Sequence, residues 1–255
     1  MRKSLFNAAV KAFPIVLLQG IVAEAAEVKV LCSTAAIVPV MNEFVPQFER
    51  TTGHKVTIRY EFGPVLIREI EAGAAFDVAI LSLDVEDLIK RGKIAAETRV
   101  VLGRTAIGVG VRKGAPRPDI STPEAFKRTL LSAKSVAHSR DGSSGRYFLN
   151  LLERLGIAED MKTKLRPQPI ANSPAQAVAT GQAEMAVTGI AIILAVPDAE
   201  LVGSLPSELQ SYVLFTGGVG VAAKEAEAGR ALLNFLTTPE AAAAFKASGV
   251  EPVVP

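Results

Sequence analysis

The chain has 255 residues, of which 49% are hydrophobic, 21% are charged and 5% are aromatic, with no Trp. This composition supplies a sizeable apolar core and argues against disorder, and the few aromatic rings offer no stacking platform for single-stranded nucleic acid or sugars. The formal net charge is +2, but residues 1–25 hold three of the 28 basic and one of the 26 acidic residues. The rest of the chain has 25 of each sign, so a non-specific nucleic-acid-binding role is not supported.

The first 25 residues have the pattern of a secretory signal peptide. Arg2 and Lys3 precede an apolar stretch that is clearest over residues 12–23, and the small residues of "AEA" at 23–25 follow it. The uninterrupted apolar part is shorter than the ~20 residues of a membrane-spanning helix. The alternative is a buried N-terminal helix. We expect export to a bacterial periplasm, which agrees with a single cysteine, Cys32, that cannot form an internal disulfide.

From residue 28 onward, strand-like runs alternate with helical patterns. The first half predicts strands over 28–33, 55–62 and 77–82, and helices over 37–52, over 65–72 and in a short segment that stops at Gly92. Glycines follow each of these helices, as expected because glycine readily takes the left-handed conformation that ends a helix. Alternating strands and helices predict a parallel sheet with helices on both faces.

The second half of the chain repeats this alternation. Thr122 is expected to cap a helix whose first residue is Pro123. Further along, the sequence predicts strands at 135–139 and 185–190, and helices at 145–156, 173–181 and 237–249.

The string "GVGV" occurs twice, at 108–111 and at 218–221. Alternating glycines let backbones approach closely and flex. One interpretation is an α/β fold with two Rossmann-like lobes joined by two crossover strands, with lobe I formed by residues 26–107 plus 217–255 and lobe II by residues 108–216. The other is a single sheet that contains two unrelated glycine-rich strands.

Candidate binding residues follow from the rule that open parallel sheets bind ligands beyond the carboxyl ends of their strands. The loops at that edge supply hydroxyls, glycines and free helix-start amides, which suit an oxyanion or a carboxylate. The predicted ligand-binding residues are Ser33, Thr34, Gly63, Ser143, Ser144, Gly145, Arg146 and Thr188. The alternative is that Ser144 only caps its helix and Arg146 is solvated. Whether Arg140 or Arg146 faces the site stays open.

Motifs of catalysis and metal binding are absent from the sequence. It has no HExxH, CxxC, GxxxxGK[ST] or GxSxG pattern. His54 lies in a predicted turn and is expected at the surface, whereas His138 lies in a predicted strand and is expected to be packed. We therefore expect no metal or other cofactor, and we assign no catalytic residue.

Five segments together resemble the type II periplasmic solute-binding proteins, in the branch that contains the molybdate-binding proteins. They span nearly all of residues 27–254 and read "VKVLCSTAAIVPVMNEFVPQFERTTGHKVTIRYEFG", "IREIEAGAAFDVAILS", "GSSGRYFLNLLERLGI", "AVATGQAEMAVTG" and "ALLNFLTTPEAAAAFKASGVEPV". The resemblance implies two lobes that close about a hinge, a small anionic ligand in the cleft, a monomer, and delivery of the ligand to an inner-membrane ABC permease.

The chain departs from the molybdate-binding proteins at two places. Their loop after the second strand usually carries Ser and Gly, whereas here Pro64, which has neither a hydroxyl nor an amide hydrogen, follows Gly63. The tyrosine that is usual near their final cleft loop is missing from "MAVTGI". A small carboxylate is therefore at least as good an expectation as molybdate.

A second function stays open beside binding. The segments "VGSLPSELQSYVLF" and "GSSGRYF" are similar to a subgroup of this fold reported as periplasmic aconitate isomerase. Such an enzyme would need a base that takes a proton from an allylic carbon and returns it. Asp141 and His138 are candidates, and nothing in the sequence favours one over the other.

Overall fold

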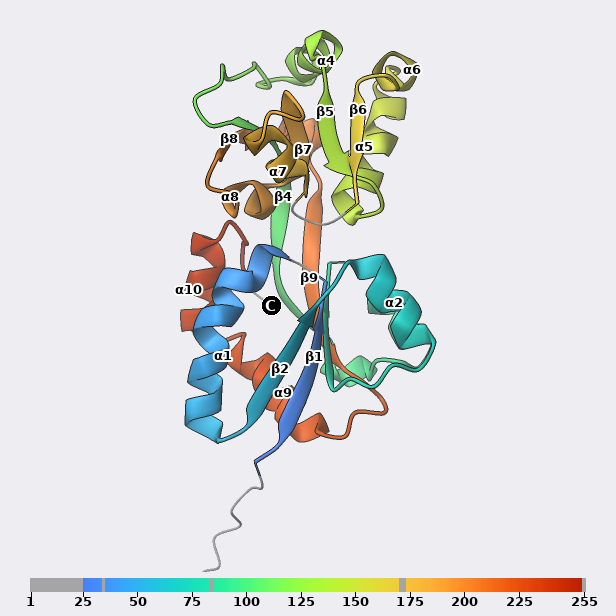
Figure 1. The fold of residues 1–255 in the computed structure, drawn as a ribbon. Helices are drawn as coiled ribbons and strands as arrows, with labels where there is room; N and C mark the ends of the chain where they lie inside the picture. Colours follow the sequence, from blue (N-terminus) through green and yellow to red (C-terminus); the bar gives the residue numbers. More distant parts are fainter. Residues whose placement is uncertain (1–24, 34, 83–84, 170–172, 254–255) are drawn as a thin grey trace, which may run out of the picture.

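Two lobes joined by a pair of long strands make up the fold of this computed structural model (Figure 1). It describes residues 25–33, 35–82, 85–169 and 173–253. The predicted signal peptide, apart from Ala25, and the predicted site residue Thr34 lie outside the described residues. Among the helices in the described ranges, none has the length and apolarity needed to cross a membrane.

Lobe I is the part of the structure built around β1 (Glu27–Cys32), β2 (Lys55–Tyr60), β3 (Val78–Leu81) and β9 (Tyr212–Val219), with helices on both sides of these strands (Figure 1). Its helices are α1 (Val38–Thr52), α2 (Gly63–Glu71), α3 (Val85–Lys90), α9 (Ala226–Phe235) and α10 (Pro239–Ala247), with 3-10 turns at η1 (Ala35–Ile37) and η2 (Ala96–Thr98).

Lobe II is the part inserted between β4 and β9. Its strands are β5 (Val136–Ser139), β6 (Leu165–Gln168), β7 (Met185–Gly189) and β8 (Ala199–Ser204). Its helices are α4 (Pro123–Ser132), α5 (Ser143–Arg154), α6 (Ala158–Met161), α7 (Ser173–Ala179) and α8 (Ile190–Leu194), and a 3-10 turn, η3 (Ser207–Leu209), leads into β9.

Strands β4 (Val100–Arg112) and β9 carry the chain between the lobes. The strand order is β2-β1-β3-β9-β4-β7-β5-β6, with β8 also paired to β4. Pairing is parallel among β1, β2 and β3 and among β5, β6 and β7, and antiparallel where β9 and β4 meet. The prediction of two α/β lobes joined by crossover strands is therefore confirmed.

The two GVGV strings do not lie at the crossing itself. β4 pairs with β9 up to Ala106 and with β7 from Ile107 onward. The first string, at 108–111, thus lies in the lobe II part of β4, and the second, at 218–221, begins at the lobe I end of β9. The residue boundaries predicted for the lobes stay a prediction.

Each lobe has a buried apolar core. Lobe I packs Phe48 of α1 and Phe245 of α10 against its sheet, and lobe II packs Phe126 and Phe148 in the same way. Full burial of such side chains contributes about 1.5–3 kcal/mol each. The lobe I cluster continues into lobe II through Ile192 of α8, so apolar contact as well as the two strands joins the lobes.

The starts of three helices can be compared with the predicted ones. Thr122 accepts a hydrogen bond from the Ala125 N–H at 3.1 Å, which confirms the predicted cap. Two predicted starts were two residues late, because α2 begins at Gly63 and α5 at Ser143. Pro64 fits the first turn of α2, where a missing N–H breaks no helical hydrogen bond.

Candidate functional site

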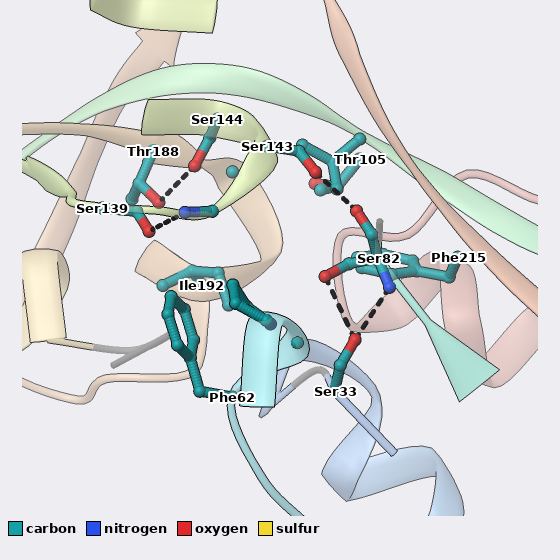
Figure 2. A pocket seen from close by; sticks show the side chains of 15 residues that line it. Ser33, Phe62, Ser82, Thr105, Ser139, Ser143, Ser144, Thr188, Ile192 and Phe215 are labelled. Carbon is teal, nitrogen blue, oxygen red and sulfur yellow. Dashed lines mark hydrogen bonds between the residues drawn. The ribbon is translucent and has the colours of Figure 1, made fainter. Parts of the chain in front are cut away.

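A cavity lies between the lobes, beyond the carboxyl ends of β1, β3, β5 and β7 (Figure 2). Hydroxyl side chains from both lobes line it, together with apolar side chains, Phe62, Ile192 and Phe215 among them. Parallel strands end at the same edge of a sheet, so loops far apart in the sequence meet there. The serines that follow or end these strands therefore lie together at the edge of each lobe that borders the cavity.

Lobe I contributes two serines that bond to each other. Ser33 directly follows β1, and its Oγ accepts a hydrogen bond from the backbone N–H of Ser82, which follows β3, at 2.9 Å. The two Oγ atoms are 3.4 Å apart. The Ser33 side chain is therefore held in one position, and a hydroxyl hydrogen of this pair remains available for a ligand.

Lobe II contributes the start of α5 and the residues around it. Gly142 is the N-cap residue, and its N–H donates to Ser139 Oγ at 3.0 Å. Ser144 Oγ and Thr188 Oγ1 are 3.5 Å apart, a weak contact that leaves both hydroxyls free to turn to a ligand. The interpretation of Ser144 as a helix cap is thus wrong, because Gly142 occupies the cap position.

The amides of the first turn of α5 add to this polar wall. They have no partner within the helix, and the helix dipole places partial positive charge at this end. A helix start of this kind favours an anion. Ser143 and Ser144, which line the cavity, belong to this first turn, so the helix start lies at the cavity wall.

One hydrogen bond connects the lobes directly at the cavity. Ser143 Oγ donates to the backbone oxygen of Ser82 at 2.6 Å (Figure 2). These residues are 61 positions apart in the sequence. The contact requires the lobes to be close together, so the structure shows a closed arrangement at this point.

The cavity is small and, in the described part of its lining, uncharged. Its volume open to water-sized molecules is about 50 Å³. One water needs ~10–15 Å³ on this measure, so a group of about three to five heavy atoms fits. The lining residues that the structure describes include no Asp, Glu, Lys, Arg or His. Hydroxyls and amides without a nearby carboxylate favour an anionic group over a cation.

The predicted site residues fall into three groups. Ser33, Gly63, Ser143, Ser144 and Thr188 line the cavity. Gly145 lies behind it: a Cβ there would be 1.7 Å from the backbone oxygen of Ser139, so the glycine permits the close contact between α5 and β5. Arg146 lies in an adjacent groove with Arg68 and Arg140.

The sequence analysis missed three hydroxyl-bearing lining residues, Ser82, Thr105 and Ser139, and the N-cap residue Gly142. Ser82 and Ser139 end predicted strands, so the edge rule that found Ser33 would have found them. Thr105 is already engaged, because its Oγ1 donates to the Gly249 backbone oxygen at 3.0 Å and accepts from the Ala191 N–H at 3.1 Å. It joins β4 to α8 and to the C-terminal segment.

The two candidate bases do not line the cavity. His138 is buried, and its Nδ1 donates to the Ser139 backbone oxygen at 2.9 Å. Burial lowers the pKa of His138, and the hydrogen bond to Ser139 opposes that shift. Asp141 lies in the groove, where its carboxylate pairs with Arg140 at 2.9 Å. Across the described ranges, no group of three or more His, Cys, Asp or Glu could hold a metal ion.

Comparison with known proteins decides the family. Residues 28–251 match the family described as bacterial extracellular solute-binding protein. The chain belongs to this family. The resemblance drawn from the sequence is thereby confirmed.

Relatives within this family carry two different names. The chain is 33% identical to an aconitate isomerase from a Pseudomonas species, covering 87% of this chain and 86% of the relative. It is 30% identical to the molybdate-binding protein ModA of Azotobacter vinelandii, covering 89% and 90%. Of the solved structures, the periplasmic molybdate-binding protein of A. vinelandii aligns with a TM-score of 0.73 at 18% identity, over 89% of this chain and 99% of that one. That alignment supports the two-lobe fold.

Proposed function

We propose that this solute-binding protein captures a small anion in the cavity between its lobes and holds it by closure about β4 and β9. The observation that carries the proposal is the set of hydroxyls that both lobes present to one uncharged cavity, with Ser33 and Ser82 on one side and Ser139, Ser144 and Thr188 on the other. A ligand that bridges the lobes stabilises the closed state over the open one.

The ligand class follows from the donors. Serine and threonine hydroxyls and helix-start amides donate hydrogen bonds to an oxyanion or a carboxylate without needing an opposite charge. The relatives named molybdate-binding protein support an anion of this kind. Because family members are solute-binding proteins, we further propose that this chain works in the periplasm as a monomer, and that it delivers its ligand to an inner-membrane ABC permease.

Thermal unfolding tests the proposal directly. Molybdate, tungstate, sulfate, phosphate, citrate and aconitate are added separately to the mature protein, and the melting temperature is measured. A ligand at a hundredfold excess over its Kd adds about 2.7 kcal/mol to the free energy of unfolding. For a chain of this size that is a rise of roughly 5–10 °C. If none of the six raises the melting temperature, the anion proposal is wrong for these ligands.

A matched pair of variants locates the site. Ser144→Ala removes a hydroxyl from the cavity, and we expect affinity for the best ligand to fall about fivefold, which corresponds to one lost hydrogen bond of ~1 kcal/mol. Ser132→Ala, on an exposed hydroxyl of α4 that bonds to Thr129, should leave affinity unchanged. Equal affinities of the two variants would move the site elsewhere.

The second candidate function is an isomerase that shifts the double bond of a tricarboxylic acid. The 33% identity to a relative named aconitate isomerase favours it. The base that such a reaction needs is not supplied by His138 or Asp141, since neither lines the cavity. Incubation with trans-aconitate distinguishes the two functions: cis-aconitate forms if the chain is an isomerase, and the substrate stays unchanged if it only binds.

A further inference from the structure

A cationic groove continues from the cavity toward the surface. Phe62 and Pro64 line both spaces, so the two are neighbours along one wall. The groove has a volume of about 480 Å³, against about 50 Å³ for the cavity. A ligand that occupies both is therefore much larger than one that fills the cavity alone.

The charges of the groove are not balanced. Its described lining has three guanidinium groups, of Arg68, Arg140 and Arg146, and one carboxylate, of Asp141. Asp141 pairs with Arg140 at 2.9 Å. Arg68 and Arg146 have no ion-pair partner among the described residues, so the groove keeps two uncompensated positive charges.

These two arginines come from opposite lobes and from the helices that start at the cavity. Arg68 is four residues after Pro64 in α2, about one turn along that helix. Arg146 is three residues after Ser143 in α5, on the same side of the helix as the serine that contacts lobe I. Each helix thus begins at the cavity and presents an arginine to the groove about one turn later.

We propose that the natural ligand is an extended organic anion with two or three carboxylates, one held in the hydroxyl-lined cavity and another between Arg68 and Arg146. This inference rests on the proposed function, because it assigns the ligand class to the same site. The planar fork of a guanidinium matches a carboxylate, and Phe62 and Pro64 offer an apolar wall to the carbon chain between the charged groups. A compact tetrahedral oxyanion would fill the cavity and leave both arginines unused.

The decisive variant is Arg68→Gln/Arg146→Gln, and Arg154→Gln is its control. Arg154 is the exposed arginine at the far end of α5, eight residues or ~12 Å beyond Arg146, so its loss changes net charge without touching the groove. Isothermal titration calorimetry measures the Kd of tricarballylate, succinate, sulfate and molybdate for the parent and both variants. The altered side chains are exposed, and an unchanged melting temperature confirms that the double variant is folded.

We expect tricarballylate to bind the parent more tightly than sulfate or molybdate does. The double variant should weaken tricarballylate by about tenfold or more, as expected for two partly exposed charge-assisted contacts, and should change the Kd of sulfate by no more than about twofold. Arg154→Gln should leave both constants unchanged. Raising the salt concentration should weaken tricarballylate binding more in the parent than in the double variant.

Two other results separate the two proposals. If sulfate or molybdate binds and the carboxylates do not, or if the double variant binds tricarballylate as the parent does, the inference about the groove is wrong while the anion-binding proposal stands. If none of the four anions binds the parent, the anion-binding proposal itself fails, and the groove assignment fails with it.

Discussion

Gly145 is the residue at which a single added methyl group should damage the site most. It is the third residue of α5, and its backbone φ is not in the left-handed region, so alanine is conformationally allowed there. An alanine Cβ would, however, lie 1.7 Å from the backbone oxygen of Ser139 and 2.7 Å from the carbonyl carbon. That oxygen also accepts the hydrogen bond from His138. The start of α5 must therefore move away from β5 by more than 1 Å.

Two effects oppose each other in Gly145→Ala. Alanine has the higher helix propensity, which alone would stabilise α5 by up to ~1 kcal/mol. Overlap with a backbone atom that cannot rotate away costs about 1–3 kcal/mol or more, as overpacked sites do. We expect the overlap to prevail by ~1–2 kcal/mol, so the melting temperature should fall by roughly 2–8 °C, given ~2–4 °C per kcal/mol for a chain of this length.

Ligand binding should suffer more than stability does. Ser143 and Ser144 immediately precede Gly145 and would move with it, and loss of two hydrogen bonds of ~1 kcal/mol each lowers affinity about 30-fold. Calorimetry of unfolding and of ligand binding measures both effects. Gly203→Ala is the control, because its Cβ would meet only Ile120 Cδ1 at an ordinary 3.6 Å. A Gly145→Ala protein that melts like the parent and binds with the same affinity would refute this account of the glycine.

Three further changes test other parts of the structure. Ser143→Ala removes the hydrogen bond to the Ser82 backbone oxygen, which holds the lobes together, so it should weaken ligand binding about fivefold. It should also raise the radius of gyration of the ligand-free protein, as measured by X-ray scattering. Unchanged scattering would argue against a role of this bond in closure. Because burial lowers the pKa of His138, the unfolded chain binds more protons than the folded one below pH ~6.5, and stability should fall as the pH drops from 7 to 5. That fall should be smaller in His138→Gln, as measured by melting temperature against pH. Asp77→Asn should lower the free energy of unfolding by about 1–3 kcal/mol, as measured by chemical denaturation. The Asp77 carboxylate accepts hydrogen bonds from three backbone N–H groups at 2.8–3.0 Å, and an amide side chain cannot replace both of its oxygens. An unchanged free energy of unfolding would contradict this role.

Much of the fold could be predicted from local patterns. Strand-like runs that alternate with helical periods predicted the parallel parts of both lobes, and Gly53, whose φ is 78°, ends α1 as expected for a left-handed C-cap. The starts of α2 and α5 were placed late because Gly63 and Ser143 are poor helix formers in the middle of a helix. At the first turn that disadvantage matters little, since its N–H groups make no intrahelical bonds in any case.

The sequence predicted which residues of each lobe lie at the candidate site, but not how the residues of the two lobes are placed relative to each other. The edge rule found Ser33, Ser144 and Thr188, because each directly follows or ends a strand or begins a helix. The apolar wall of Phe62 and Ile192 gave no signal, since a buried apolar residue in sequence looks the same whether it faces a core or a cavity. The short distance between Ser143 of lobe II and Ser82 of lobe I depends on how the two lobes are oriented, and local sequence patterns do not encode that orientation.

The division of donors between the lobes explains how such a site would couple binding to closure. A ligand held first by the hydroxyls of one lobe gains the hydrogen bonds of the other only when the cleft closes. With two such bonds of ~1 kcal/mol each, closure is favoured about 30-fold over the unliganded equilibrium. The Ser143–Ser82 bond adds to the closed state whether or not ligand is present, so it raises the fraction of protein that is ready to bind. An anion that contacts only one lobe would gain nothing from closure, so hydroxyls on both sides of the cleft are what would couple binding to closure.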